Sequence, residues 1–319
     1  MPSIKVLDTG YESFAYEQQL FESNGYRFEI FPGDKGDVLG KRAFASDADG
    51  LLIRWTEIDH SFLSAMTNLK AIVRYGVGYE NLNLGDINKT QVKVANVQGY
   101  GNHAVSDHAL ALMYACNRDL PKGQREIRSL FGAPPEKRIL EFHECTLGII
   151  GLGRIGGTLC NKAIHLFDKV IATDPYISKN RFNKLGAEEV SLEELMKKSD
   201  VISIHCNLTE ETTNMLGEKE FALTTKCPVM INTARGPIID EKSLLKALKS
   251  DQIFRAGIDV FNTELAHELP EDLLDHPSVI CTGHIAWYSE RSHRELQKRA
   301  ADNLLGLLRG EIVDDCLNP

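Results

Sequence analysis

The chain has 319 residues and a formal net charge of −9, with 43% hydrophobic and 25% charged residues, which is ordinary for a globular protein. The negative charge is spread along the chain without a basic run, so neither nucleic acid nor an anionic membrane is expected as a partner, and no apolar segment is long enough to span a bilayer. The length exceeds that of one ordinary hydrophobic core and predicts two domains.

The N-terminal part of the chain alternates short strands and helices, which predicts a small α/β domain. Helices are expected over 11–23 and 61–66. The expected strands, all rich in apolar residues, are 4–7, 27–30, 51–54, 71–74 and 92–96. The chain starts directly in an apolar strand and lacks the features of a signal peptide, and its seven scattered cysteines are typical of reduced thiols, so a cytoplasmic location is expected.

The middle of the chain contains the most informative motif. A long helix over 103–117 and a charged segment over 121–138 precede an apolar strand at 146–150. The sequence Gly151-Leu152-Gly153-Arg154-Ile155-Gly156 follows at once and leads into a helix that ends near 167. A second strand over 169–173 then ends at Asp174, about 20 residues past the glycines. This order of strand, glycines, helix, strand and acid predicts a dinucleotide-binding unit, in which Arg154 and Ile155 also contact the cofactor.

Each part of this unit has a physical role. Gly151 permits a tight turn, Gly153 lets the backbone approach a pyrophosphate, and Gly156 lets helix and strand pack closely. The helix N-terminus presents free N–H groups and a positive dipole end to the phosphates. The Asp174 carboxylate can accept hydrogen bonds from a ribose 2′-hydroxyl and would repel a 2′-phosphate, so NAD is the predicted cofactor.

The alternation of strand and helix resumes beyond this unit. The expected strands are 201–205, 229–232, 253–259 and 279–281, and the last helix covers 289–309. The pattern predicts an α/β fold with a Rossmann-type doubly wound parallel sheet and a second, flavodoxin-like α/β domain. We expect the NAD-binding domain to cover 100–288 and the substrate domain to comprise 1–99 and 289–319.

Three polar residues that follow predicted strands are candidates for catalysis, because α/β sheets bind ligands at the carboxyl ends of their strands. The Arg235 guanidinium matches a substrate carboxylate bidentately. His284 is the residue type that most often moves a proton near neutral pH. Glu264 can hold His284 and favour its protonated form. Each residue alone has an ordinary structural alternative, since this chain has ten histidines and many surface charges.

Several segments in order along the chain resemble the D-isomer-specific 2-hydroxyacid dehydrogenase family. They are 74–78, 151–156, 232–236, 257–261 with Glu264, and His284. The resemblance implies an enzyme that interconverts a small 2-oxo acid and its D-2-hydroxy acid with NAD(H), in which Arg235 binds the carboxylate and His284, supported by Glu264, is the acid and base. The segment His284-Ile285-Ala286-Trp287-Tyr288-Ser289-Glu290 is most similar to the C-terminal-binding protein branch of this family.

The resemblance also implies further contacts and an assembly. The additional cofactor-binding residues are Cys206, Thr212, Thr233, Ala234 and Asp259, of which Asp259 is expected at the nicotinamide carboxamide. Val77 and Gly78 are expected to bind the substrate carboxylate through backbone N–H groups. Arg54 and Trp287 are expected to line the substrate pocket, although Trp287 has an alternative role as a packing residue. In the family the 103–138 region forms much of a two-fold interface, so a homodimer is expected, and no metal is expected.

Two alternative functions remain open at this point. A 3-phosphoglycerate dehydrogenase would use Arg54 and Arg74 to meet a phosphate. An NAD-sensing interaction protein resembling the C-terminal-binding proteins would retain the same catalytic set. One departure from the family pattern is Gly283, which stands where a proline is frequent and predicts a more mobile loop before His284.

Overall fold

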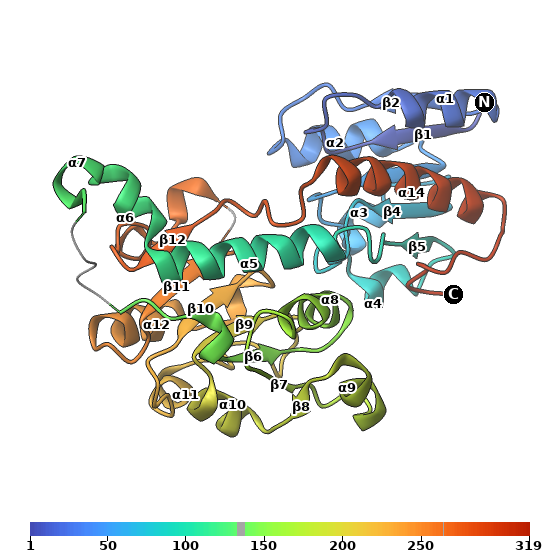
Figure 1. Ribbon diagram of the computed structural model, residues 1–319. Helices are drawn as coiled ribbons and strands as arrows, with labels where there is room; N and C mark the ends of the chain where they lie inside the picture. Colours follow the sequence, from blue (N-terminus) through green and yellow to red (C-terminus); the bar gives the residue numbers. More distant parts are fainter. Residues whose placement is uncertain (133–137, 264) are drawn as a thin grey trace. The chain divides into compact units, whose positions relative to one another are not determined.

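The computed structural model describes residues 1–132, 138–263 and 265–319. It divides into two compact units. The first unit comprises Met1–Tyr100 and Ser289–Pro319, and the second comprises Gly101–Tyr288. Each unit contains one parallel sheet flanked by helices (Figure 1). Within the described ranges, no helix is long and apolar enough to cross a membrane.

The first unit has a five-stranded sheet in the order β2-β1-β3-β4-β5, which is the flavodoxin-type order. Its strands are β1 (Ser3–Val6), β2 (Arg27–Ile30), β3 (Gly50–Ile53), β4 (Ala71–Arg74) and β5 (Lys93–Ala95). Its helices are α1 (Ala15–Ser23), α2 (Val38–Ala45), α3 (His60–Leu63), α4 (Leu84–Ile87) and α14 (Glu290–Leu308). Helix α14 packs against α1, β3 and β4, so the end of the chain completes the unit that its start begins (Figure 1). The predicted flavodoxin-like fold is confirmed.

Local details of this unit differ from the sequence predictions. Helix α1 begins at Ala15 and not at Tyr11. Gly10 has a φ of 123°, and the Tyr11 ring packs at 5.0 Å from the rings of Tyr75 and His293, so tertiary contacts take this segment out of the helix. Helices α2 and α4 are absent from the prediction because they are too short to show a clear helical period.

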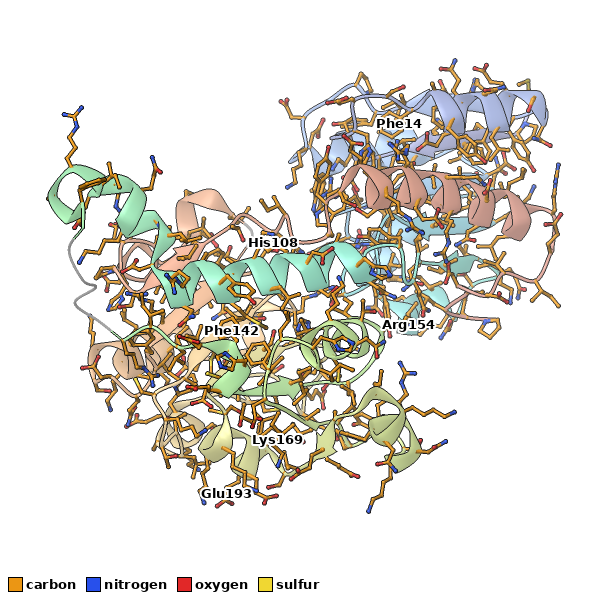
Figure 2. All side chains as sticks on the ribbon, in the orientation of Figure 1. Phe14, His108, Phe142, Arg154, Lys169 and Glu193 are labelled. Atoms are coloured by element: carbon orange, nitrogen blue, oxygen red, sulfur yellow. The ribbon has the colours of Figure 1, made fainter. Side chains whose placement is uncertain are left out.

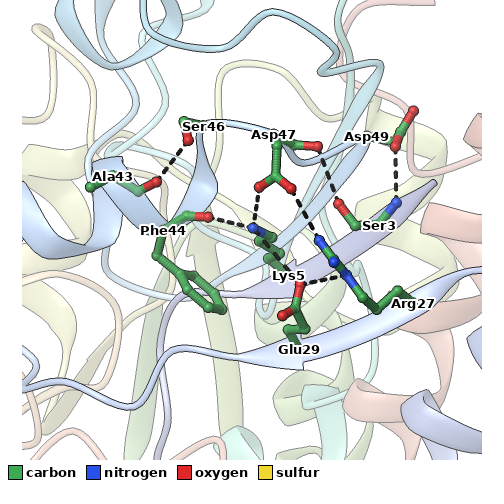
Figure 3. Close-up of polar contacts among 9 residues, drawn as sticks. All are labelled: Ser3, Lys5, Arg27, Glu29, Ala43, Phe44, Ser46, Asp47 and Asp49. Carbon is green, nitrogen blue, oxygen red and sulfur yellow. Dashed lines mark hydrogen bonds and ion pairs between the residues drawn. The ribbon is translucent and has the colours of Figure 1, made fainter. Parts of the chain in front are cut away.

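A buried lysine in β1 is matched by polar partners. Lys5 is 5% exposed, and its ammonium donates to the Phe44 carbonyl at 2.6 Å and pairs with Asp47 (Figure 3). The Glu29 carboxylate lies 3.8 Å away on β2. The hydrogen bond from Lys5 is the main reason that the pKa of Asp47 is lowered. A charge inside an apolar strand is therefore compatible with the fold because it is paired.

A buried carboxylate after β1 organises the loop after β3. Asp8 accepts a hydrogen bond from the Lys41 ammonium at 2.7 Å. It also accepts from the backbone N–H groups of Arg54, Trp55 and Thr56 at 2.7, 2.9 and 2.9 Å. Burial by itself would raise the pKa of Asp8, but these hydrogen bonds outweigh burial and hold that pKa below its ordinary value. Asp8 thereby fixes the backbone that carries Arg54.

The second unit has a seven-stranded sheet in the order β12-β11-β10-β9-β6-β7-β8. Its strands are β6 (Thr146–Ile150), β7 (Lys169–Thr173), β8 (Glu188–Glu189), β9 (Val201–Ile204), β10 (Val229–Asn232), β11 (Arg255–Ile258) and β12 (Val279–Cys281). The strand order reverses between β6 and β9, which is the arrangement of a Rossmann sheet. The predicted doubly wound sheet is therefore confirmed.

Helices cover both faces of this sheet (Figure 1). The helices of the second unit are α5 (Asn102–Arg118), α6 (Leu120–Arg125), α7 (Ile127–Leu130), α8 (Arg154–Ala163), α9 (Lys179–Leu185), α10 (Leu192–Lys198), α11 (Glu218–Phe221), α12 (Glu241–Lys249) and α13 (Glu271–Leu274), of which α6 and α7 extend beyond the end of α5. Neighbouring strand residues alternate between two cores, since Ile149 and Ile231 pack in the core with α5 and α8, whereas Ile150 and Met230 pack in the core with α10 and α12. Both faces of the strands are buried, as a parallel sheet requires.

Replacing Asp8 with alanine is expected to lower the free energy of unfolding by about 3–5 kcal/mol, because the Lys41 ammonium would remain buried without its counter-charge. Urea unfolding followed by circular dichroism measures the loss. Lys298→Ala is the matched control, because this lysine forms an exposed ion pair with Asp302 on α14 and should change stability by less than about 1 kcal/mol. Equal losses in the two variants would contradict the role given to Asp8.

Candidate functional site

The loops that carry Arg235, Asp259, His284 and the glycine motif leave one edge of the seven-stranded sheet. In the parallel register, Asn232 at the end of β10 pairs with Ile258 at the end of β11, and Ile258 pairs with Cys281 at the end of β12. The loops after these strands carry Arg235, Asp259 and His284, respectively. The glycine loop after β6 lies on the same edge, because β6 pairs in parallel with β9 and β9 with β10. The sheet therefore brings the loops together.

The glycine loop has the geometry that a pyrophosphate site needs. Gly151 has a φ of 90°, and a Cβ there would lie 2.5 Å from the backbone nitrogen of Cys206. A Cβ on Gly156 would lie 2.0 Å from the Gly151 carbonyl oxygen, so helix α8 can approach the strand only with glycine there. A Cβ on Gly153, in contrast, would meet no atom of the described residues within 4 Å. The backbone at Gly153 is thus open to a ligand.

Helix α8 starts directly beyond this open position. Gly153 is its N-terminal cap, and Arg154 and Ile155 are its first residues. Arg154, which Figure 2 labels, is exposed. The first N–H groups of a helix have no intrahelical partner, and together with the helix dipole they favour phosphate at this end. The residues present therefore fit a bound dinucleotide.

Two carboxylates lie near the end of β7, where a ribose would bind. Asp174 accepts hydrogen bonds from the backbone N–H groups of Leu152 at 2.8 Å and Tyr176 at 3.0 Å. The Tyr176 hydroxyl donates to Glu211 at 2.8 Å, and this hydrogen bond is the first cause of the raised pKa of Tyr176. A carboxylate offers about four acceptor positions, so Asp174 retains capacity for ribose hydroxyls. The negative charge here favours hydroxyl groups over a further phosphate.

The loop after β9 contains a cysteine and a histidine, and both are neutral at pH 7. Burial raises the pKa of the Cys206 thiol to about 11, so it is not a thiolate at neutral pH. Burial lowers the pKa of His205 to about 4, and its neutral ring is hydrogen-bonded to Ser203 at 2.8 Å. The Thr212 hydroxyl donates to the Asn207 carbonyl at 2.7 Å and holds the loop in shape.

Arg235 is positioned by a buried asparagine at the end of β10. The Asn232 amide donates to the Arg235 carbonyl at 2.9 Å and accepts from the Ala234 N–H at 3.0 Å. The half-buried Arg235 guanidinium donates to the Ala234 carbonyl at 2.7 Å. Among the described residues, the buried Thr233 hydroxyl has no hydrogen-bond partner, which a bound ligand could supply. A Cβ on Gly236 would lie 2.0 Å from Phe261, so the loops after β10 and β11 are in direct contact.

His284 has an unusual backbone conformation. Its φ is 53°, in the left-handed region that residues other than glycine seldom adopt. Its N–H donates to the Asp259 carbonyl at 2.8 Å, and its own carbonyl accepts from the Trp287 indole at 3.0 Å. The next two N–H groups, of Ile285 and Ala286, donate to the Asp259 carboxylate at 3.0 and 2.9 Å. The fully buried Asp259 thus binds the turn around His284, and its contact with the nicotinamide carboxamide stays a prediction.

Four predicted site residues lie outside the described part of the second unit. Glu264 lies outside the described residues. Val77, Gly78 and Arg54 belong to the first unit, and the structure places them only within it. There the Val77 carbonyl accepts from Asn96 at 2.6 Å, and the Arg54 guanidinium lies 4.1 Å from the Trp55 ring centroid.

Sequence reasoning missed three residues of the site. They are Asn232, Thr282 and His108, which form hydrogen bonds in the loops after β10 and β12. A polar residue at the end of a strand is a signal that both Asn232 and Thr282 carry. That signal is too common to be used without the partner residues, which come from distant parts of the chain.

Comparisons with known proteins identify the family. The model described as "D-isomer specific 2-hydroxyacid dehydrogenase, NAD binding domain" matches residues 110–286, more than half of the chain. The glyoxylate reductase of Korarchaeum cryptofilum is 32% identical over 308 residues, which cover 94% of this chain and 91% of that protein. The D-3-phosphoglycerate dehydrogenase of Mycobacterium tuberculosis is 32% identical over 277 residues, covering 86% of this chain and 52% of that protein. This chain spans about half the length of the phosphoglycerate dehydrogenases that it matches.

Solved structures resemble the whole chain. An acyclic imino acid reductase in complex with NADPH and D-Arg is 27% identical with a TM-score of 0.87, and 99% of both chains are covered. The D-lactate dehydrogenase of Escherichia coli is 27% identical with a TM-score of 0.84 and the same coverage.

The chain therefore belongs to the D-isomer-specific 2-hydroxyacid dehydrogenase family. It carries the NAD-binding domain of that family and is an NAD-dependent oxidoreductase of 2-hydroxy acids, as the sequence predicts. The proteins reported above are reductases and dehydrogenases, and the similarity of residues 284–290 to the C-terminal-binding protein branch stays a prediction.

The wild-type protein is expected to bind NADH much more tightly than NADPH, because the Asp174 and Glu211 carboxylates would repel a 2′-phosphate. Asp174→Ala should reduce this preference chiefly by weakening the binding of NADH, since it also removes the carboxylate that accepts hydrogen bonds from the ribose hydroxyls. Titration of protein fluorescence with each nucleotide measures the four dissociation constants.

Glu211→Gln serves as the companion variant, because it removes a neighbouring charge and keeps the Asp174 carboxylate. It should strengthen NADPH binding and leave NADH binding unchanged. Equal affinities of the wild-type protein for both nucleotides would contradict the assignment.

Proposed function

We propose that this protein interconverts a small 2-oxo acid and its D-2-hydroxy acid, with Arg235 and His284 as catalytic residues. The observation that carries the proposal is the placement of these two side chains on loops from β10 and β12, which flank β11 at the ligand-binding edge of the sheet. The glycine loop that fits a dinucleotide lies on the same edge. A cation and a proton carrier beside a nicotinamide site are what reduction of a 2-oxo acid needs.

The proposed roles follow from the chemistry of each group. Bound NADH supplies the hydride that reaches C2 of the 2-oxo acid. The Arg235 guanidinium binds the substrate carboxylate with two hydrogen bonds and polarises the adjacent carbonyl. The His284 imidazolium gives its proton to the carbonyl oxygen, and in the reverse direction neutral His284 removes the proton from the hydroxyl group. Glu264, which is assigned from the sequence alone, favours the protonated imidazole.

The remaining predicted contacts complete the proposal. The glycine loop, Cys206, Thr212 and Ala234 contact the cofactor, and Thr233 offers its buried hydroxyl. The predicted role of the Val77 and Gly78 backbone N–H groups in binding a carboxylate is carried by the sequence resemblance.

A phosphorylated 2-hydroxy acid is the second candidate substrate, as in a 3-phosphoglycerate dehydrogenase. The observation in its favour is the arrangement of Arg54 and Arg74 in the first unit. Ile53 pairs with Arg74 across the neighbouring strands β3 and β4, so both arginines lie at the carboxyl edge of that sheet. Relative kcat/KM values for 2-oxo acids with alkyl and phosphate-bearing side chains distinguish the two substrates.

His284→Ala is expected to lower kcat by a factor on the order of 10²–10⁴, because the general acid is lost, while NADH affinity stays close to that of the wild type. Arg235→Lys should also be severely impaired, because an ammonium group cannot reproduce the two parallel hydrogen bonds of a guanidinium. Steady-state rates with a 2-oxo acid and NADH, together with fluorescence titration of NADH, measure both effects. A nearly normal rate in either variant would refute the assigned roles.

We also propose that the protein forms a homodimer through the region after α5. Leu112 and Met113 of α5 are buried in the core of their own unit and are not available to a partner. Beyond α5, however, Leu120, Ile127 and Phe131 are 56%, 57% and 86% exposed. Large apolar side chains exposed close together along the chain are typical of an interface.

Light scattering at micromolar concentration is expected to give the mass of a dimer. The double variant I127E and F131E should have the mass of a monomer and an unchanged circular dichroism spectrum, because two charges in each protomer would be buried in the interface. Ile312→Glu is the control, since this residue is 98% exposed and lies in the other unit. A monomeric wild-type protein would overturn the proposal.

A further inference from the structure

We infer that His108, Thr282 and Trp287 are positioning residues of the reaction, which hold the turn that aims His284 and act on the substrate only through it. The inference rests on the proposed function, because it takes His284 as the proton donor. The sequence predicts that Trp287 lines the substrate pocket. We assign it a different role, in which its indole N–H holds the backbone of His284 by a hydrogen bond.

The backbone of His284 needs external support. Its φ of 53° is disfavoured for any residue with a side chain, and such conformations persist only where the surroundings impose them. Position 283 is not crowded, since a Cβ on Gly283 would meet no atom of the described residues within 4 Å. The structure supplies this support as hydrogen bonds to the peptide groups on either side of His284.

Both peptide groups that flank His284 are held. The group before it donates its N–H to the Asp259 carbonyl at 2.8 Å, which restricts φ. The group after it is held at both ends, which restricts ψ, because its carbonyl accepts from the Trp287 Nε1–H at 3.0 Å and its N–H, that of Ile285, donates to Asp259 Oδ1 at 3.0 Å. Loss of the indole N–H would release the carbonyl end of this peptide.

The Asp259 carboxylate is itself oriented by two further side chains. It is fully buried, and its Oδ1 accepts from the Thr282 hydroxyl as well as from Ile285. His108 Nε2 lies 3.0 Å from the Thr282 oxygen and 3.6 Å from Asp259 Oδ1. A hydroxyl has one proton to donate, and since Thr282 gives it to Asp259, Thr282 must accept the Nε2–H of His108. The proton positions of this chain of hydrogen bonds are thereby fixed.

His108 connects the turn to a rigid part of the second unit. It lies in the middle of α5, where Figure 2 labels it. Helix α5 has 17 residues and packs against β10, β11 and β12. A side chain on a long packed helix keeps its position better than one on a loop. The hydrogen bonds from His108 to Thr282 and from Thr282 to Asp259 therefore fix the position of the turn relative to helix α5.

The test uses variants that each remove the polar group of one hydrogen bond and put a nonpolar side chain in its place. Trp287→Phe removes the indole N–H, Thr282→Val removes the hydroxyl, and His108→Leu removes Nε2. Each is expected to lower kcat by up to about 10²-fold, the cost of a small misplacement of a catalytic group. The dissociation constant of NADH, from fluorescence titration, should change much less than kcat, because the turn is separate from the glycine loop that is predicted to bind the pyrophosphate.

Conservative variants provide the rescue. Thr282→Ser keeps the hydroxyl and His108→Gln places an amide N–H near the former Nε2, so both should recover most of the wild-type kcat. His165→Leu repeats the histidine substitution at an exposed position outside this network and should leave kcat unchanged.

Three outcomes would overturn the inference. The first is a wild-type kcat in both Thr282→Val and His108→Leu. The second is a loss of both NADH binding and thermal stability in these variants, without recovery in Thr282→Ser and His108→Gln. That result would indicate a purely structural role. The third is a Trp287→Phe variant that changes the relative kcat/KM among 2-oxo acids and not kcat, which would make Trp287 a pocket residue. His284→Ala, assayed alongside, separates these results from failure of the proposed function, since an active His284→Ala enzyme refutes the function itself.

Discussion

Parallel strands in register end at the same edge of a sheet, and the functional geometry of the second unit depends on this constraint. The ends of β10, β11 and β12 are aligned, so three loops from separate parts of the chain leave the sheet side by side. Such crowding of backbone is possible only where side chains are absent. Gly236 has no side chain at the contact with Phe261, and Gly151 has none at the contact with Cys206. The glycines are therefore part of what brings the site together.

A buried carboxylate that binds consecutive backbone N–H groups occurs in both units. Asp8 binds the N–H groups of residues 54–56 after β3, and Asp259 binds those of residues 285 and 286 after β12. Each carboxylate shapes a loop that carries a proposed functional side chain. The means of stabilising the charge differ, because Asp8 has the Lys41 ammonium and Asp259 has the Thr282 hydroxyl and His108. Fixed loops of this kind suit a site whose groups must hold their positions.

The sequence predicts the features that depend on local pattern. The glycine loop, Asp174 and the confirmed folds of both sheets follow from residues close together in the chain. Features that depend on tertiary contacts escaped prediction. The late start of α1 results from the packing of Tyr11 on distant rings, and the roles of His108 and Thr282 become visible only when α5 lies beside β12. The left-handed conformation of His284 has no signal in the residue itself.

The hydrogen bonds around His284 offset the mobility that is expected from Gly283. A glycine before the proton donor increases the conformational freedom of the unfolded turn, whereas a proline would have reduced it. Order in this turn must then come from interactions made in the folded state. The indole N–H of Trp287 and the carboxylate of Asp259 supply them from opposite ends of one peptide group. With Gly283 in the chain, the position of His284 is thus set by its hydrogen-bond partners rather than by a restricted backbone.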